Sequence, residues 1–208
     1  MPEPNALHCA SSTGASPWVL RWLDRLPRGA TVLDFAAGSG RHARAACERG
    51  LTVLAVDRDG QALARVRGDE KPAAGGDAEG AGDAREGRIA LRVADLESGP
   101  WPFAAHERFD AVVVANYLFR PRFALLASLL APRGLLVYET FSQGNERHGR
   151  PSNPAFLLAP GELLARTRRA GLTVLGYETG VVQRPSAAVI QRVCAIRARG
   201  TEALASLG

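Results

Sequence analysis

The chain has 208 residues and a net charge of +5; 46% of its residues are hydrophobic and 23% are charged. This balance excludes a chain that is disordered throughout, and the length suits a single domain over residues 1–208 with room for a flexible insert. No apolar run approaches the roughly 20 residues that a membrane-spanning helix requires, and the first residues lack the basic and apolar parts of a signal peptide. We therefore expect a cytoplasmic protein with no membrane partner.

Arginine carries almost all of the positive charge, since Lys71 is the only lysine. An arginine bias of this kind is typical of a GC-rich bacterial genome, whereas a nucleic-acid groove requires clusters of basic residues. The main cluster, Arg166, Arg168 and Arg169, falls late in an expected helix, where positive charge also complements the helix dipole. Composition thus argues against a nucleic-acid partner, and RNA is kept as an alternative.

Apolar runs of strand length alternate with stretches of helical periodicity, which predicts an α/β fold with a doubly wound, mostly parallel sheet. The first helix belongs to an N-terminal helical segment over residues 1–29, and Ser16 and Pro17 mark its start. The expected helices cover residues 16–25, 41–49, 61–67, 122–130 and 160–170. The seven expected strands cover residues 31–35, 51–56, 89–94, 109–115, 135–141, 172–177 and 188–196.

The end of the chain departs from this alternation. A loop containing glycine and proline separates the last two expected strands, and it leaves no room for a crossover helix. Such a connection suits an antiparallel pair, because parallel neighbours need a longer crossover. We therefore expect a Rossmann-like, seven-stranded sheet that closes with an antiparallel hairpin.

One internal stretch is expected to lie outside the packed fold. Residues 68–87 contain no large apolar side chain, so they cannot bury enough surface to offset the entropy of ordering them. We interpret them as a flexible surface insert between the second expected helix and the third expected strand.

The strongest functional pattern is a strand that runs into a glycine turn and then into a helix, over residues 32–43. Glycine at Gly38 and Gly40 permits positive φ angles and a close approach of a ligand, and the helix start offers free N–H groups. Asp57 ends the second expected strand, where a carboxylate can accept both hydroxyls of a ribose. Asp95 and Asn116 follow the third and fourth strands, so polar groups converge at the carboxyl edge of the sheet. This pattern predicts a small-molecule site.

Two cofactors compete for that site. Residues 38–43 satisfy the glycine pattern of dinucleotide-binding proteins, so an NAD(P)-dependent oxidoreductase is an alternative. Asp34 precedes the turn and would repel a pyrophosphate, whereas it would attract the ammonium and sulfonium groups of S-adenosylmethionine. The closing hairpin also favours the methyltransferase sheet over the all-parallel dinucleotide sheet.

The motifs resemble those of class I S-adenosylmethionine-dependent methyltransferases, in particular the compact tellurite-resistance and thiopurine-type enzymes. The resemblance spans about residues 30–198. The matching segments are residues 33–40 (LDFAAGSG), 56–57 (VD), 94–96 (ADL), 109–117 (FDAVVVANY) and 130–136 (LAPRGLL). In one departure, Ala36 stands where most members have the first glycine, which is tolerable if its φ is negative.

The resemblance implies methyl transfer from S-adenosylmethionine to an acceptor. The expected cofactor-binding residues are Asp34, Ala36, Gly38, Gly40, Asp57, Arg58, Asp95, Leu96 and Asn116. We expect a small-molecule acceptor, with an rRNA or tRNA methyltransferase as the alternative. The three cysteines are far apart and have no paired metal-ligand spacing, so no metal site is expected.

The acceptor is expected to contact residues 142–158, a polar segment that leaves the fifth strand at the ligand edge of the sheet. Phe156 and Leu157 are expected to anchor its far end in the core. Candidates for the catalytic site are Tyr117, His148 and Arg150, although none is a convincing general base. A soft acceptor such as a thiol or a metalloid oxyanion would need no base. The oligomeric state cannot be predicted from these patterns.

Overall fold

The computed structural model describes residues 14–67, 87–183 and 186–198. Residues 1–13 of the predicted N-terminal segment lie outside the described residues, as does the predicted insert apart from Gly87. Within the described ranges, no helix is long and apolar enough to cross a membrane. The chain divides into two compact units, Met1–Pro102 and Phe103–Gly208. The expected single domain stays a prediction.

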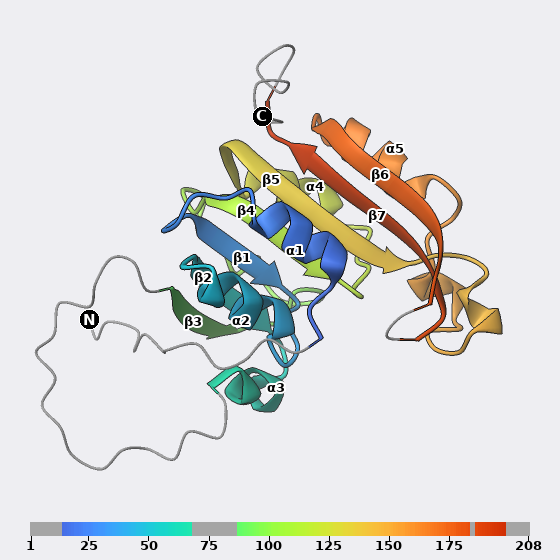
Figure 1. Ribbon diagram of the computed structural model, residues 1–208, viewed down its shortest axis with the longest axis horizontal. Coiled ribbons are helices and arrows are strands. Elements are labelled where there is room, and N and C mark those ends of the chain that lie inside the picture. Colours follow the sequence, from blue (N-terminus) through green and yellow to red (C-terminus); the bar gives the residue numbers. More distant parts are fainter. Residues whose placement is uncertain (1–13, 68–86, 184–185, 199–208) are drawn as a thin grey trace, which may run out of the picture. The chain divides into compact units, whose positions relative to one another are not determined.

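The first unit is built on three parallel strands, β1 (Thr31–Phe35), β2 (Thr52–Asp57) and β3 (Arg88–Val93). Its helices are α1 (Pro17–Leu23), α2 (Arg41–Glu48) and α3 (Gly60–Ala64), and the 3-10 turn η1 (Arg65–Arg67) follows α3. Strands β1 and β2 are rich in β-branched residues and are mostly buried, as expected for a parallel sheet covered by helices, whereas Ile89 is the one buried residue of β3. Figure 1 shows α2 lying across β1 and β2.

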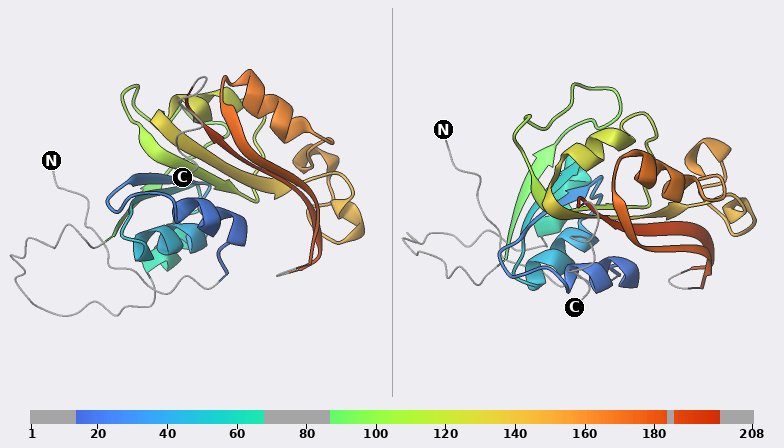
Figure 2. Two further views of the ribbon diagram at one scale, coloured as in Figure 1. Left: turned by 45° about the horizontal axis from the view of Figure 1, so that its top comes forward. Right: turned by 90° about the horizontal axis from the view of Figure 1, so that it is seen from above.

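The second unit contains β4 (Phe109–Ala115), α4 (Phe123–Ser128), β5 (Leu130–Phe141), α5 (Glu162–Arg169), β6 (Thr173–Val182) and β7 (Ala188–Ile196). Strands β4 and β5 are parallel, while β7 is antiparallel to both β5 and β6. Two 3-10 turns, η2 (Asn145–Arg147) and η3 (Pro154–Phe156), lie between β5 and α5. Figure 2 shows α5 packed on one face of β6 and β7.

The strand order of the seven-stranded sheet is β3-β2-β1-β4-β5-β7-β6. This order, together with the antiparallel pairing of the last strands, confirms the predicted fold class and the closing hairpin. The two largest boundary errors concern β5, which begins at Leu130 and not at residue 135, and β6, which continues to Val182 and not to residue 177. Leu130 pairs with Phe109, and the register then shifts before Leu135 pairs with Ala111. An apolar pattern could not reveal this irregular first part, because it contains Pro132, Arg133 and Gly134.

Candidate functional site

The turn after β1 has the backbone conformation of a ligand-binding glycine turn. Gly38 and Gly40 have φ angles of 55° and 71°, in the left-handed region that glycine tolerates best. Ala36 also has a positive φ, 58°, so the condition under which an alanine would be tolerated at this position is not met. An alanine in this region is strained by about 1–2 kcal/mol, because its Cβ approaches the following carbonyl oxygen. The turn thus contains a residue that fits its backbone conformation poorly.

The two glycines have different surroundings. A Cβ atom built on Gly38 meets nothing within 4 Å, whereas one built on Gly40 would lie 2.4 Å from Cγ2 of Val66. Gly40 is therefore needed for packing against the segment after α3. The space beside Gly38 is open, so a ligand can approach the backbone there.

Asp57 connects the end of β2 to this turn. The Gly38 N–H donates to Oδ2 of Asp57 over 2.8 Å, and the Asp59 N–H donates to Oδ1 over 2.9 Å. The carboxylate is half-buried, and two oxygens have about four acceptor sites in all, so capacity remains for a ligand's hydroxyl groups. The predicted ribose acid therefore lies directly beside the predicted glycine turn.

Asp34 is 2% exposed, and its Oδ2 accepts a hydrogen bond from the Ala43 N–H over 2.9 Å. Burial raises the pKa of its carboxyl group to about 7, although the hydrogen bond from Ala43 and the charge of Arg41 oppose the shift. The side chain thus fixes the first turn of α2 to β1. A direct contact with a cofactor, as expected for Asp34, stays a prediction.

Asp95 lies two residues after β3 and closes a turn of its own. It accepts hydrogen bonds from the Glu97 N–H (2.8 Å), the Ser98 N–H (3.1 Å) and the Ser98 hydroxyl group. These bonds, led by that of the hydroxyl group, lower the pKa of Asp95 to about 2, and the charge of exposed Arg58 contributes. Leu96 is 4% exposed. The predicted residues of the first unit therefore line the carboxyl ends of its three strands, as expected for this class of sheet.

Three residues beside the turn were not identified as structural anchors from sequence. His42 is 4% exposed, and its Nε2 accepts a hydrogen bond from the Ser16 N–H over 3.2 Å. Burial, with a smaller effect from Arg41, lowers the pKa of His42 to about 3, so the imidazole is neutral. Arg41 donates to the Gly14 carbonyl (3.1 Å), and Arg44 donates to the Ser39 carbonyl (2.6 Å). The glycine turn and the chain before α1 are thus fixed to α2.

In the second unit, Asn116 directly follows β4; it has a φ of 57° and donates its N–H to the Glu139 carbonyl over 3.0 Å. Asparagine is one of the few residues that tolerate this conformation. The carbonyl of Tyr117 accepts a hydrogen bond from the Tyr138 hydroxyl group over 2.7 Å. Burial raises the pKa of Tyr138, so this hydroxyl group remains a donor at neutral pH. The connection after β4 is therefore held against β5.

Residues 142–158 form an ordered segment with buried polar anchors. Figure 2 shows it beyond the carboxyl end of β5, and the Oδ1 of Asn145 accepts from the Val189 N–H (3.1 Å) at the start of β7. Asn145 is 1% exposed and also donates to the Pro151 carbonyl (2.9 Å). Fully buried Gln191 donates to the Ser142 hydroxyl group (2.8 Å) and to the Ala159 carbonyl (2.7 Å). The segment is thus held in place by hydrogen bonds to β7.

The side chains of residues 142–158 that were predicted to contact the acceptor or the core differ in exposure. His148 and Arg150 are exposed. Leu157 is 2% exposed and anchors the segment as predicted, but Phe156 is 52% exposed, so its predicted place in the core is wrong. Asn153 caps η3, since its Oδ1 accepts a hydrogen bond from the Ala155 N–H over 2.9 Å. Phe156 therefore projects from a capped turn and leaves Leu157 to fill the core.

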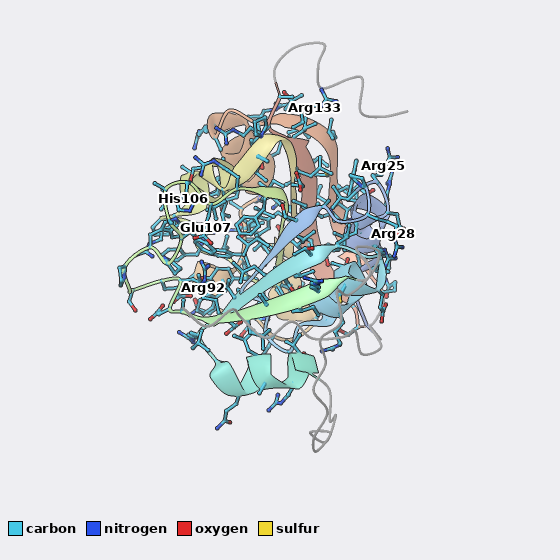
Figure 3. The ribbon with its side chains drawn as sticks, turned by 90° about the vertical axis from the view of Figure 1, so that its left-hand side faces the viewer. Arg25, Arg28, Arg92, His106, Glu107 and Arg133 are labelled. Carbon is cyan, nitrogen blue, oxygen red and sulfur yellow. The ribbon has the colours of Figure 1, made fainter. Side chains whose placement is uncertain are left out.

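Three of the arginines labelled in Figure 3 lie away from the carboxyl ends of the strands, whereas Arg92 lies near the end of β3 and donates to the Pro102 carbonyl over 2.9 Å. Arg25 and Arg28 follow α1 and precede β1, and Arg133 lies in the irregular first part of β5. The arginines nearest the glycine turn include Arg41 and Arg44, which donate to backbone carbonyls. Arg41 and Arg44 are thus engaged with backbone groups of the first unit.

Comparison with known proteins supports the methyltransferase interpretation. A family model described as a methyltransferase domain matches residues 33–137. No curated protein sequence matches the chain significantly. Among solved structures, the fold is similar to that of TehB from Haemophilus influenzae, with a TM-score of 0.68 and 15% identity. That match covers 89% of this chain but only 63% of the TehB chain.

Two further structures show the same fold. An S-adenosylmethionine-dependent methyltransferase from Mesorhizobium loti has a TM-score of 0.62 and 22% identity, over 90% of this chain and 100% of its own. The 1,6-didemethyltoxoflavin-N1-methyltransferase from Burkholderia thailandensis has a TM-score of 0.59 and 22% identity, over 88% of this chain and 77% of its own. The sequence-based predictions of family, enzyme class and cofactor are thereby confirmed. Because the family model covers just over half of the chain, the protein belongs to the methyltransferase-domain family and is a class I S-adenosylmethionine-dependent methyltransferase.

Proposed function

We propose that the enzyme transfers the methyl group of S-adenosylmethionine to a small-molecule acceptor, with residues 142–158 as one wall of the acceptor site. The observation that carries this proposal is the coupling of Gly38 to Asp57. The space beside the Gly38 backbone is open, and the Gly38 N–H is hydrogen-bonded to the half-buried carboxylate of Asp57. A ligand that enters this space can therefore reach both groups. A nucleoside with two free ribose hydroxyls suits this cradle.

The residues present fit the cofactor. Asp57 would accept hydrogen bonds from the ribose hydroxyls, and the backbone at Gly38 would lie against the amino-acid part. Asp95 and Leu96 would contact the adenine, the former through its carboxylate and the latter through its backbone N–H. The remaining cofactor-binding residues that we propose are Asp34, Ala36, Gly40, Arg58 and Asn116.

When bound, S-adenosylmethionine supplies a methyl group on a sulfonium, which is already an activated leaving group. The protein has to hold the acceptor in line with that methyl group at about 3 Å and to exclude water. The fixed wall of residues 142–158 suits this positioning role, because buried Asn145 and Gln191 hold it in place before any acceptor arrives. Tyr117 is held by its carbonyl at the end of β4 and is proposed to pack beside the reacting groups.

A small acceptor is favoured over RNA because Arg41 and Arg44, the arginines at the start of α2, donate to backbone carbonyls of the first unit. The toxoflavin-precursor methyltransferase from Burkholderia thailandensis, which shares the fold, acts on a small molecule. His148 and Arg150 are exposed and stay candidates only for acceptor contacts. We further propose a soft acceptor, a thiol or a metalloid oxyanion, since such a nucleophile needs no general base. The cytoplasmic location stays a prediction.

Two measurements test this function. The first is a thermal-shift series with S-adenosylmethionine, S-adenosylhomocysteine and NAD(P), since a ligand that binds the native state alone raises its melting temperature. The second is the formation of S-adenosylhomocysteine with thiophenol or potassium tellurite as the acceptor, with a short RNA duplex as the comparison. Stabilisation by S-adenosylhomocysteine together with turnover of thiophenol or tellurite is expected. Methylation of the RNA alone would overturn the small-molecule assignment.

A further inference from the structure

One guanidinium group connects the segment after β4 to the acceptor wall and to α5. Arg120 donates from Nε to Oε1 of Glu162 (2.6 Å) and from NH2 to Oε2 (2.9 Å). It also donates from NH1 to the Ala155 carbonyl (2.6 Å) and from NH2 to the Leu157 carbonyl (2.7 Å). Three parts of the second unit thus converge on a single side chain, although up to 42 residues separate them in sequence.

The carboxylate partner of this guanidinium is itself held from two sides. Glu162 accepts hydrogen bonds from Nε of Arg166 (2.7 Å) and from the Ala159 N–H (3.0 Å). These contacts, led by that of Arg120, lower the pKa of Glu162 to about 2, so the pair stays charged at neutral pH. A forked pair between arginine and carboxylate is directional, because its two parallel hydrogen bonds fix the orientation of both groups. A lysine could keep the charge but not this geometry.

The two carbonyls that Arg120 binds in η3 and just after it flank Phe156. This ring is 52% exposed, on a turn that Asn153 caps and that begins with Pro154. An aromatic ring that stays in water does not contribute the hydrophobic stabilisation that burial would give. Leu157, the residue after Phe156, is by contrast buried. The backbone on both sides of an exposed apolar side chain is therefore fixed.

Arg120 also follows Tyr117 closely in the connection after β4. The carbonyl of Tyr117 is held by the Tyr138 hydroxyl group, and Arg166 donates to the Arg120 carbonyl (3.4 Å). The segment that carries Tyr117 and the segment that carries Phe156 are thus joined through one side chain.

We propose that Arg120 is a positioning residue of the acceptor site, which holds the segments of Tyr117 and Phe156 in one arrangement for an acceptor with a flat apolar face. The proposal rests on the proposed function of residues 142–158 as the acceptor wall. Because the two loops are already ordered, binding of the acceptor loses no further conformational entropy from them. The fixed arrangement also rejects acceptors that do not fit. Arg120 itself acts through the segments that it holds.

The first test measures the positioning itself. Arg120→Lys should lose amide hydrogen-exchange protection in residues 117–122 and 155–158, while the strands keep theirs and the affinity for S-adenosylhomocysteine changes by less than about twofold. Arg168→Lys, on the exposed side of α5, is the matched control and should leave both loops protected. Unchanged protection in Arg120→Lys, or a loss spread over the whole second unit, would overturn the proposal.

The second test measures the apolar site and requires no turnover. The fluorescence anisotropy of 2-naphthol should report its binding to the enzyme saturated with S-adenosylhomocysteine. Arg120→Lys and Phe156→Ala should each weaken this binding about fivefold or more, as expected for the loss of about 1 kcal/mol of contact. Phe156→Ala should keep the wild-type melting temperature, because its side chain is exposed.

The outcomes separate this inference from the function beneath it. If the wild type does not bind 2-naphthol, or if both variants bind it as the wild type does, the apolar acceptor site is refuted. This holds even where thiophenol or tellurite is methylated. If neither of these acceptors is methylated while Arg120→Lys still loses loop protection and naphthol binding, the soft-acceptor proposal fails and the role of Arg120 stands. With thiophenol, the positioning role also predicts a raised KM at nearly unchanged kcat.

Discussion

The Gly38 N–H donates to Oδ2 of Asp57 over 2.8 Å, so the residue expected to bind the cofactor's ribose also fixes the turn expected to contact its amino-acid part. The opposite oxygen of Asp57 accepts from the Asp59 N–H, which precedes α3. Because both oxygens hold backbone groups, Asp57 shapes the site before the cofactor enters. A substitution at Asp57 should therefore affect both the turn and the ligand.

Two substitutions at Asp57 separate these effects. Asp57→Asn keeps one carbonyl oxygen for a backbone N–H but loses the charge, whereas Asp57→Ala loses both acceptors. We expect each variant to weaken S-adenosylhomocysteine binding by about 10-fold or more. We also expect Asp57→Ala to be less stable than Asp57→Asn by about 1–3 kcal/mol of folding free energy, because it leaves both backbone N–H groups without an acceptor. Titration calorimetry and urea unfolding measure the two quantities. Asp24→Ala, which removes a surface ion pair with Arg49, is the control. Wild-type affinity in both variants would refute the assignment of Asp57.

The two glycines of the turn should respond differently to alanine. Gly38→Ala should fold with a loss of about 1 kcal/mol, because its φ of 55° is strained for alanine while its Cβ has open space. The cofactor affinity of this variant should fall, since the new methyl group occupies the space for the ligand. Gly40→Ala should be destabilised more strongly, because its Cβ would lie 2.4 Å from Val66. Val66→Ala in the Gly40→Ala background should restore part of the lost stability. Equal losses of stability at the two glycines would contradict this distinction.

Ala36→Gly should stabilise the protein. The φ of 58° strains alanine by about 1–2 kcal/mol, and glycine's larger unfolded-state entropy offsets about 0.5–1 kcal/mol of that gain. The melting temperature should therefore rise by about 1–3 °C for a chain of this size. A decrease in melting temperature would show that the alanine methyl group makes packing contacts that outweigh the strain.

The sequence predicted those features that depend on neighbouring residues. Strand-length apolar runs located all seven strands, and the loop before β7 indicated the antiparallel hairpin. The glycine turn and Asp57 could be identified because both lie at strand ends, where this class of sheet places ligands. Each of these signals lies within a short stretch of chain.

The features that sequence did not reveal depend on distant partners. Gln191 binds Ser142, which is 49 residues away, and Arg120 binds Glu162, which is 42 residues away. A single sequence carries no sign of which polar side chains will meet across such distances. Phe156 and Leu157 are adjacent apolar residues, and the course of the backbone, not hydrophobicity, decides which one is buried. Likewise His42 could not be identified as a buried anchor until its acceptor role for Ser16 was known.

Asp34 and His42 should give the protein's stability opposite pH dependences. Asp34 has a folded-state pKa of about 7, above its unfolded value of 3.8, so the folded state holds the proton more tightly. Its contribution to stability is complete below pH 4 and is lost as the pH rises to 7, by at most about 4 kcal/mol. His42 has a folded-state pKa of about 3, below its unfolded value of 6.5. Its contribution is complete above pH 6.5 and is lost as the pH falls toward 3, by a similar amount.

Because these two dependences oppose each other between pH 4 and 6.5, each should become visible when the other group is removed. Asp34→Asn should gain stability relative to the wild type as the pH rises through this window, since the wild type alone bears the cost of the buried charge. His42→Gln keeps an acceptor for the Ser16 N–H and should lose stability relative to the wild type over the same window. Urea unfolding at several pH values measures both differences, with exposed Asp24→Asn as the control. Differences that do not change with pH, or that change with the same sign in both variants, would show that the two groups are not buried in the protonation states described here.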